Sequence, residues 1–376
     1  MAKSAQRWMV SADSHVTEPP RCYIDHIEPK FRDRAPRMVK GPAGGDVFVI
    51  DGLQGSVPMG IIAAAGQDPR AMRLDEAAFE DLHPGGWDPT ARLKDQDKDG
   101  VVAEVLYPSV GMALCNLTDA PYMSACFKAY NRWLEGFVSA APARLIGIGQ
   151  TAVTSIDEAI ADLHEIKKQG LRGVMLPGYP CTDFDYDDPA FDSLWQTAVD
   201  LALPLSFHIL TSERGRNSMG ISKSADRGPK ENRAHAVMRA NQDIIGMFIW
   251  TRVFERFPKL RVVCVESDAG WAPHYIYKLN YHYERRRFWS NFGEMQKKPG
   301  EYFCENVYMT FQDDVVALQT VDMMNPKRLM WANDFPHSDS TWPNSQKLYT
   351  DLTAHLPEKH KRAIYRDNVV ELYGLA

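Results

Sequence analysis

Several signatures that would assign this 376-residue chain to a familiar functional class are missing from it. It has no P-loop, no GxSxG elbow and no HExxH motif, each of which would point to a specific hydrolase chemistry. No apolar run is long enough to span a bilayer, and the first residues carry no signal-peptide pattern. Its six cysteines are scattered without CxxC spacing, so we expect reduced thiols in a cytoplasmic protein.

The chain also lacks the excess of positive charge that nucleic-acid binding requires. Its formal net charge is −6, and its only dense basic run, Arg285-Arg286-Arg287, is interpreted as a solvated helix face. Hydrophobic residues make up 44% of the chain and charged residues 24%, as in ordinary globular proteins. We therefore expect a small-molecule substrate, with no nucleic-acid partner and no membrane partner.

From about residue 91 onward, short apolar runs alternate with helical stretches. One such stretch, from Ser155 to Lys168, has apolar residues along one face and is followed by Gly170, a typical helix stop. With the opening run there are eight apolar runs, at residues 8–12, 101–107, 145–149, 173–176, 205–209, 262–266, 307–311 and 329–332. Continuous apolar strands separated by helices indicate a parallel sheet buried on both faces. Eight of them predict an α/β fold, a distorted (β/α)8 TIM barrel, with an open doubly wound sheet as the alternative.

A long segment rich in proline, glycine and aspartate, residues 16–90, follows the first predicted strand. Within it, residues 47–52 read as a short strand and turn, one arm of a hairpin. A loop of this length in a compact domain is usually functional or disordered, and its aromatic and methionine residues favour an ordered, lid-like insertion. We expect residues 1–376 to form a single barrel domain that contains this insertion.

One glycine motif is interpreted as structural. The segment Gly147–Ala152 satisfies the GxGxxA pattern of dinucleotide-binding loops. It follows the third strand rather than the first, however, and no well-placed acid for a ribose lies about twenty residues on. We therefore expect a tight strand here and no dinucleotide.

Carboxylate and imidazole side chains gather at the ends of the predicted strands. Asp13 and His15 end the first strand, and residues i and i+2 of a strand face the same side. His208 ends strand five, Glu266 ends strand six, and Asp334 and His337 follow strand eight. In a barrel these ends ring one mouth, where active sites lie. The six residues are therefore candidate metal ligands.

Each of these residues has a structural explanation when it is taken alone. A histidine near a strand end is more often hydrogen-bonded in the core, Asp334 could cap a helix, and Glu266 could pair with an arginine. If all of these explanations held, chance would have placed carboxylate or imidazole groups at the ends of four strands that the fold brings together. The set therefore favours a metal site, with Asp13, His15, His208 and Asp334 as its firmest members.

The composition of the set bears on the metal. Three carboxylates and three imidazoles exceed the three protein ligands of a catalytic zinc site. Six ligands rich in oxygen suit two ions, and they fit manganese or iron at least as well as zinc. We expect one or two divalent ions (Zn, Mn or Fe) per chain. Asp334, His208 and Glu266 are the expected catalytic residues, with Asp334 as the general base.

With these residues identified, the chain resembles the amidohydrolase-related family of the amidohydrolase superfamily, which includes aminocarboxymuconate-semialdehyde decarboxylase. The resemblance rests on Asp13–Pro19, Phe207-His208, Asn333–His337 and Pro189–Trp195, and it spans most of the chain. It implies a distorted (β/α)8 barrel that holds a divalent metal. It also implies that Asp13, His15, His208 and Asp334 occupy the ligand positions of the family.

The chain departs from this family at two points. Family decarboxylases commonly carry a His-Gly-Gly-Gly type segment after strand six, where this chain has Glu266–Gly270. No lysine ends strand four, which runs into Met175-Leu176-Pro177, so a carbamylated lysine bridging two metals is not expected.

Three functions remain open at this point. The first is a metal-dependent hydrolase or decarboxylase acting on a small carboxylated or amide-containing molecule. The second is an O2-dependent hydroxylase, an oxygenase with a dinuclear iron or manganese site. The third is a non-catalytic partner subunit. We also expect an oligomer, formed either with copies of this chain or with a homologous chain.

Overall fold

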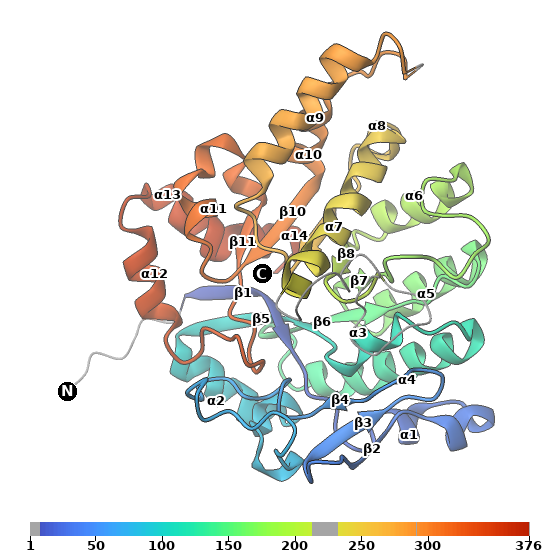
Figure 1. Cartoon of the computed structure of the whole chain (residues 1–376), viewed down its shortest axis with the longest axis vertical. Coiled ribbons are helices and arrows are strands. Elements are labelled where there is room, and N and C mark those ends of the chain that lie inside the picture. Colours follow the sequence, from blue (N-terminus) through green and yellow to red (C-terminus); the bar gives the residue numbers. More distant parts are fainter. Residues whose placement is uncertain (1–7, 213–231, 291, 376) are drawn as a thin grey trace.

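The computed structural model describes residues 8–212, 232–290 and 292–375. Within them, eight parallel strands follow one another in the order β1-β5-β6-β7-β8-β9-β10-β11, and helices surround them (Figure 1). A doubly wound sheet would reverse its strand order at a switch point, whereas this order is sequential throughout. The chain therefore folds as the predicted distorted (β/α)8 barrel.

The barrel strands lie where the apolar runs predicted them. Their bounds are β1 (Met9–His15), β5 (Val101–Tyr107), β6 (Leu145–Gln150), β7 (Gly173–Met175), β8 (Leu205–His208), β9 (Val262–Val265), β10 (Val307–Phe311) and β11 (Leu329–Trp331). Every residue of β1, β6, β8, β9 and β10 is buried, as expected for strands covered on both faces.

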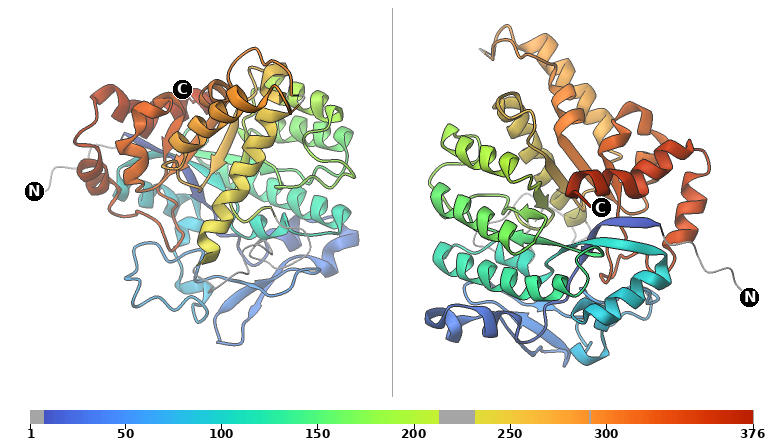
Figure 2. Two further views of the ribbon diagram at one scale, coloured as in Figure 1. Left: turned by 45° about the horizontal axis from the view of Figure 1, so that its top comes forward. Right: turned by 180° about the vertical axis from the view of Figure 1, so that it is seen from behind.

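Helices cover the outside of the barrel (Figures 1 and 2). The longer ones are α2 (Pro89–Asp99), α4 (Ala120–Ser139), α5 (Ile156–Lys168), α6 (Asp192–Asp200), α7 (Arg233–Trp250), α9 (Ala272–Arg286), α10 (Pro299–Asn306) and α12 (Ser345–Thr353). The shorter ones are α1 (Cys22–His26), α3 (Val110–Leu114), α8 (Val253–Arg256), α11 (Val315–Gln319), α13 (Glu358–Arg362) and α14 (Asn368–Tyr373). In the described parts of the chain, no helix combines the length and the apolar character needed to cross a bilayer.

The glycine motif on β6 has a packing role. A Cβ atom at Gly147 would lie 2.7 Å from the Leu171 side chain, and one at Gly149 would lie 2.7 Å from the Ile166 side chain on α5. Both glycines therefore allow close packing against the strand. Close packing therefore accounts for the glycine motif, and no bound nucleotide is needed to explain it.

The segment between β1 and α2 is ordered and forms its own small sheet. Strands β2 (Arg37–Lys40), β3 (Asp46–Val49) and β4 (Val57–Pro58) pair antiparallel, which extends the predicted hairpin by one strand. Beyond β4 the chain contacts the loop that follows β11. Ala65 N–H donates to the Pro336 carbonyl at 3.0 Å, and Ser338 N–H donates to the Ile61 carbonyl at 3.2 Å.

Candidate metal centre

Strand β1 directs a carboxylate and an imidazole into the barrel mouth. Asp13 and His15 are buried, and their side chains lie together although the pairing of β1 with β5 is irregular between Ser11 and Ser14. The ring of His15 is oriented by its Nδ1, which lies 2.9 Å from the Pro108 carbonyl oxygen. Such a contact fixes the tautomer that donates from Nδ1 and leaves the Nε2 lone pair free. Nε2 of His15 lies 3.4 Å from Oδ1 of Asp13.

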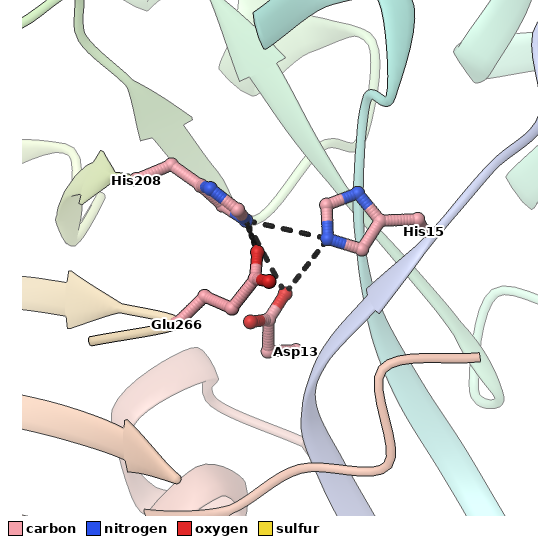
Figure 3. Close-up of side chains that lie close together, drawn as sticks. All are labelled: Asp13, His15, His208 and Glu266. Atoms are coloured by element: carbon pink, nitrogen blue, oxygen red, sulfur yellow. Dashed lines mark hydrogen bonds and ion pairs between the residues drawn. The ribbon is translucent and has the colours of Figure 1, made fainter. Parts of the chain in front are cut away.

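His208 and Glu266 reach the same point from strands β8 and β9 (Figure 3). Nε2 of His208 lies 3.3 Å from Nε2 of His15, 3.7 Å from Oδ1 of Asp13 and 3.5 Å from Oε2 of Glu266. His208 is fully buried, whereas the Glu266 side chain is 21% exposed. All four side chains point toward a common centre.

Asp334 and His337 face this centre from the loop after β11. Oδ1 of Asp334 lies 3.4 Å from Nε2 of His15 and 3.1 Å from Nδ1 of His337. The His337 ring stacks on the His15 ring, with their centroids 3.7 Å apart. Nε2 of His337 lies 2.9 Å from Oγ of Ser109, so His337 is held between a hydroxyl and a carboxylate.

Backbone strain accompanies the site. Glu266, Asp268 and Asp334 have φ angles of 55°, 52° and 53°, in the left-handed region that residues with a Cβ atom rarely adopt. Such conformations persist only where the surrounding structure imposes them, and they cluster at functional sites. The turns that aim the Glu266 and Asp334 carboxylates are therefore specified by the fold around them.

The donor set fits a divalent cation. Ligand atoms of Asp13, His15, His208 and Glu266 all lie within 4.8 Å of one another, as do those of His15, Glu266, Asp334 and His337. Oδ1 of Asp13 and both carboxylate oxygens of Asp334 are buried and accept no hydrogen bond from the described residues. Buried acceptors without donors are costly; a cation would satisfy the Asp13 oxygen, and a cation or a proton would satisfy the Asp334 carboxylate.

Burial and neighbouring charges shift the pKa values of the three carboxylates in different directions. Burial would raise the pKa of Asp13, but the neighbouring imidazoles of His15 and His208 hold that pKa well below its ordinary value. Burial, together with the charges of Asp334 and Asp13, raises the pKa of Glu266. Burial also raises the pKa of Asp334, to about 7. Groups whose environments drive their pKa values apart are typical of acid–base sites.

A pocket opens onto this centre. It has an empty volume of about 670 Å³, including open solvent at its mouth. Glu266, Asp334 and His337 belong to its wall, whereas Asp13, His15 and His208 are buried and are not among the lining residues. The other lining residues are Val57, Ile61, Ile62, Ser109, Met112, Ala113, Leu210, Ser338 and Asp339. A molecule in the pocket would therefore meet both apolar side chains and carboxylates.

The structure brings all six predicted ligand residues together, although their role as ligands stays a prediction. Sequence reasoning did not identify the apolar wall, because Val57, Ile61 and Ile62 come from the long segment after β1. It also did not identify Ser109 or Asp339. For Asp339 the one available signal was its position two residues after His337.

Comparison with known proteins relates the chain to amidohydrolases. An amidohydrolase family model matches residues 80–375. The 2-amino-3-carboxymuconate-6-semialdehyde decarboxylase of Dictyostelium discoideum is 22% identical over 309 residues, which cover 81% of each protein.

Solved structures are similar over the full length. An amidohydrolase from Mycobacterium avium subsp. paratuberculosis K-10 superposes with a TM-score of 0.78 at 20% identity, covering 98% of this chain and 99% of that one. A 5-carboxyvanillate decarboxylase from Novosphingobium aromaticivorans, complexed with manganese and 4-hydroxy-3-methoxy-5-nitrobenzoic acid, gives 0.69 at 17% identity, covering 100% of both chains. At these identities the likeness establishes the fold. None of these names is that of an O2-dependent hydroxylase, so that alternative gains no support.

Proposed function

Because the chain belongs to the amidohydrolase family, we propose that it is a metal-dependent decarboxylase of a small, largely apolar carboxylic acid. The observation that carries the proposal is the convergence of Asp13, His15, His208 and Glu266, whose ligand atoms lie within 4.8 Å of one another at the base of a pocket. Relatives with decarboxylase names favour this reaction over hydrolysis.

The proposed ion is one Mn²⁺, held by these four residues. The two overlapping groups of donors share His15 and Glu266, and the single free lone pair of His15 Nε2 can bind only one ion. Mixed oxygen and nitrogen donors suit Mn²⁺, and manganese is bound in the Novosphingobium structure. When bound, the ion supplies Lewis-acid polarisation of the substrate carboxylate.

Asp334 is the proposed proton carrier. It lines the pocket, and neither of its carboxylate oxygens accepts a hydrogen bond from the described residues. His337, whose Nε2 lies 2.9 Å from Oγ of Ser109, packs beside this carboxylate with its Nδ1 3.1 Å from Oδ1 of Asp334. In the reaction, Asp334 protonates the carbon that bears the carboxylate, the C–C bond breaks, its electron pair returns to the substrate, and CO2 leaves.

The side chains that line the pocket limit the kinds of substrate that can bind there. Val57, Ile61, Ile62 and Met112 offer an apolar surface to a flat carbon skeleton and exclude water from it. Among the described lining residues there is no lysine or arginine. The exposed Asp339 at the rim disfavours a second carboxylate at the outer end of the substrate. We propose a monocarboxylic acid with an unsaturated or aromatic body.

The domain organisation is part of the proposal. Residues 16–90 would cover the pocket within one barrel domain, since Val57, Ile61 and Ile62 line it and Ala65 is bonded to the loop after β11. The cytoplasmic location and the oligomeric assembly expected from the sequence stay predictions.

The direct test is CO2 release from Mn²⁺-loaded protein. The panel would include the monocarboxylates 2,6-dihydroxybenzoate and simple hydroxybenzoates, with the dicarboxylate 5-carboxyvanillate for comparison and Asp334→Asn as the matched variant. We expect turnover of at least one monocarboxylate, and we expect the variant to lose it while it still binds Mn²⁺. Full activity in Asp334→Asn, or hydrolysis of amides without any CO2 release, would contradict the proposal.

A further inference from the structure

The first and last strands of the barrel are joined differently from its other neighbouring strands. Within the described residues, the sheet order starts at β1 and ends at β11, and no ladder joins these two strands. They are linked just beyond β11, where Asp334 N–H donates to the Asp13 carbonyl at 3.0 Å and His15 N–H donates to the Phe335 carbonyl at 2.8 Å. The closing bonds therefore lie beside the candidate metal centre.

Helix α2 presents a polar face to this closure. Arg92, Gln96 and Asp99, spaced four and three residues apart, share one side of the helix and are 0%, 1% and 0% exposed. A helix packed on a barrel normally buries apolar side chains. A buried polar face is tolerated only where each group finds partners, and it then specifies one arrangement of those partners.

Arg92 links the part of the centre on β1 with the part on the loop after β11. Its Nη1 donates to the His15 carbonyl at 2.7 Å, and its Nη2 donates to the Phe335 carbonyl at 3.1 Å. Its Nε donates to Glu104 on β5, which neutralises the buried charge. The guanidinium also lies over the Phe335 ring, 4.8 Å from its centroid. The guanidinium, a rigid fork of N–H donors, thus contacts the backbone of the predicted ligand His15 and of Phe335, the residue after Asp334.

The network continues through Asn333. Its Nδ2 donates to Glu104 at 3.2 Å and to Asp99 at 3.3 Å, and its Oδ1 accepts from Ser14 Oγ at 2.7 Å. Asn333 therefore connects α2 and β5 with Ser14, which lies between Asp13 and His15. Every side chain in this chain of bonds is buried.

We infer that Arg92 is a positioning residue: it holds the backbone of the ligand His15, and thereby sets the affinity of the centre for its ion, and it fixes the distance from His15 to the proton carrier Asp334. The inference rests on the proposed function, because it presupposes that the centre binds a metal. Partners that orient metal ligands typically change metal affinity 10- to 100-fold when they are mutated. A planar guanidinium spans two carbonyls and a carboxylate at once, whereas a lysine ammonium is a point charge that cannot reproduce this fork.

The test compares Arg92→Lys with the wild-type protein and with Arg144→Lys. Arg144 is a matched control, because it also donates to backbone carbonyls (Val102 at 3.0 Å) and to a carboxylate (Asp97 at 2.7 Å), at the opposite, amino end of β5. Mn²⁺ affinity is measured from the signal of free Mn²⁺ in electron paramagnetic resonance. The line shape of bound Mn²⁺ reports the ligand geometry.

We expect Arg92→Lys to bind Mn²⁺ about 10- to 100-fold more weakly with an altered line shape, and Arg144→Lys to match the wild type. A purely structural role would lower the melting temperature of the metal-free protein and leave the bound line shape unchanged. Wild-type protein that binds no Mn²⁺ would overturn the proposed function itself. Wild-type binding with an affinity within twofold in Arg92→Lys would overturn this inference alone.

A second variant decides the question if Arg92→Lys fails to fold. Replacing a buried ion pair by apolar residues of similar size is often neutral for stability, so Arg92→Met with Glu104→Met removes the fork without leaving a lone charge. Gln96 and Asn333 each keep another acceptor, the Arg144 carbonyl at 3.3 Å and Asp99 at 3.3 Å. The same loss of Mn²⁺ affinity is expected, and an unchanged affinity would overturn the inference.

Discussion

Asp334 donates its backbone N–H to the carbonyl of Asp13 at 3.0 Å, although 320 positions separate the two residues in the chain numbering. This bond places the carboxylate that follows the last strand beside the carboxylate of the first. Because the backbone is fixed there, both side chains face the same point without a long loop to hold them. A site built on strand ends in this way is more rigid than one built on loops alone.

Removal of His208 should abolish tight metal binding. Its Nε2 is within 3.7 Å of donor atoms from Asp13, His15 and Glu266, so His208→Ala removes a central donor from the group. We expect Mn²⁺ binding measured by calorimetry to be lost and the far-UV circular dichroism to be retained. His164→Ala, at an exposed position on α5, serves as the control. Wild-type affinity in His208→Ala would exclude His208 as a ligand.

Glu266→Gln tests whether the strand-six carboxylate is a ligand. Gln has nearly the same shape but no charge, so we expect Mn²⁺ affinity to fall at least tenfold while the stoichiometry stays at one ion per chain. Glu165→Gln, on the exposed surface of α5, should behave as wild type. Unchanged affinity would remove Glu266 from the ligand set, and a fall from two bound ions to one would contradict the single-ion site.

Asp339→Asn should relax the selectivity for monocarboxylic acids. Asp339 is an exposed carboxylate that lines the pocket, and interactions of exposed charges are worth about 0.2–1 kcal/mol. We expect the kcat/KM of a dicarboxylic substrate to rise about 1.4- to fivefold relative to that of a monocarboxylic one. Asp313→Asn, an exposed aspartate outside the described pocket lining, is the control. An unchanged ratio would show that Asp339 does not face the substrate.

Stability should depend on pH through Asp99. Burial raises the pKa of Asp99 to about 6, although Ser345 and Asn333 donate hydrogen bonds to it. A carboxyl with a raised pKa in the folded state favours folding at low pH, and this contribution is lost as the pH rises from about 4 to about 6. The loss is roughly 3 kcal/mol in the free energy of unfolding.

Asp99→Asn should therefore flatten the pH dependence of the free energy of unfolding between pH 4 and 7, measured by urea titration. Asn can still accept from Ser345 N–H, which lies 3.0 Å from Oδ1 of Asp99. The exposed Asp157→Asn should keep the wild-type slope. A variant of Asp99 with the wild-type slope would assign the effect to other groups.

Much of the barrel was predictable because its strands are buried on both faces. Continuous apolar runs located β5 and β10 at their observed bounds, and period-two alternation placed Asp13 and His15 on one side. Carboxylate and imidazole residues at the strand ends could be predicted to form one site because the ends of barrel strands meet at one mouth. Local pattern and topology were sufficient for this part of the site.

Two parts of the site depended on contacts that no local pattern encodes. Ile61 and Ile62 reach the pocket because their segment bonds to the loop after β11, far away in sequence. Arg92, Gln96 and Asp99 have the spacing of a solvated helix face, and only the tertiary structure shows that this face is buried. Polar residues at helical spacing look alike in a sequence whether water or a buried network satisfies them.

The most direct measurement is an anomalous difference map at the manganese edge, from a crystal of the protein soaked in Mn²⁺. We expect one strong peak per chain, within bonding distance of Asp13, His15, His208 and Glu266, with Asp334 facing it from the pocket. A map without a peak at this centre, or with the ion bound elsewhere in the barrel, would contradict this expectation.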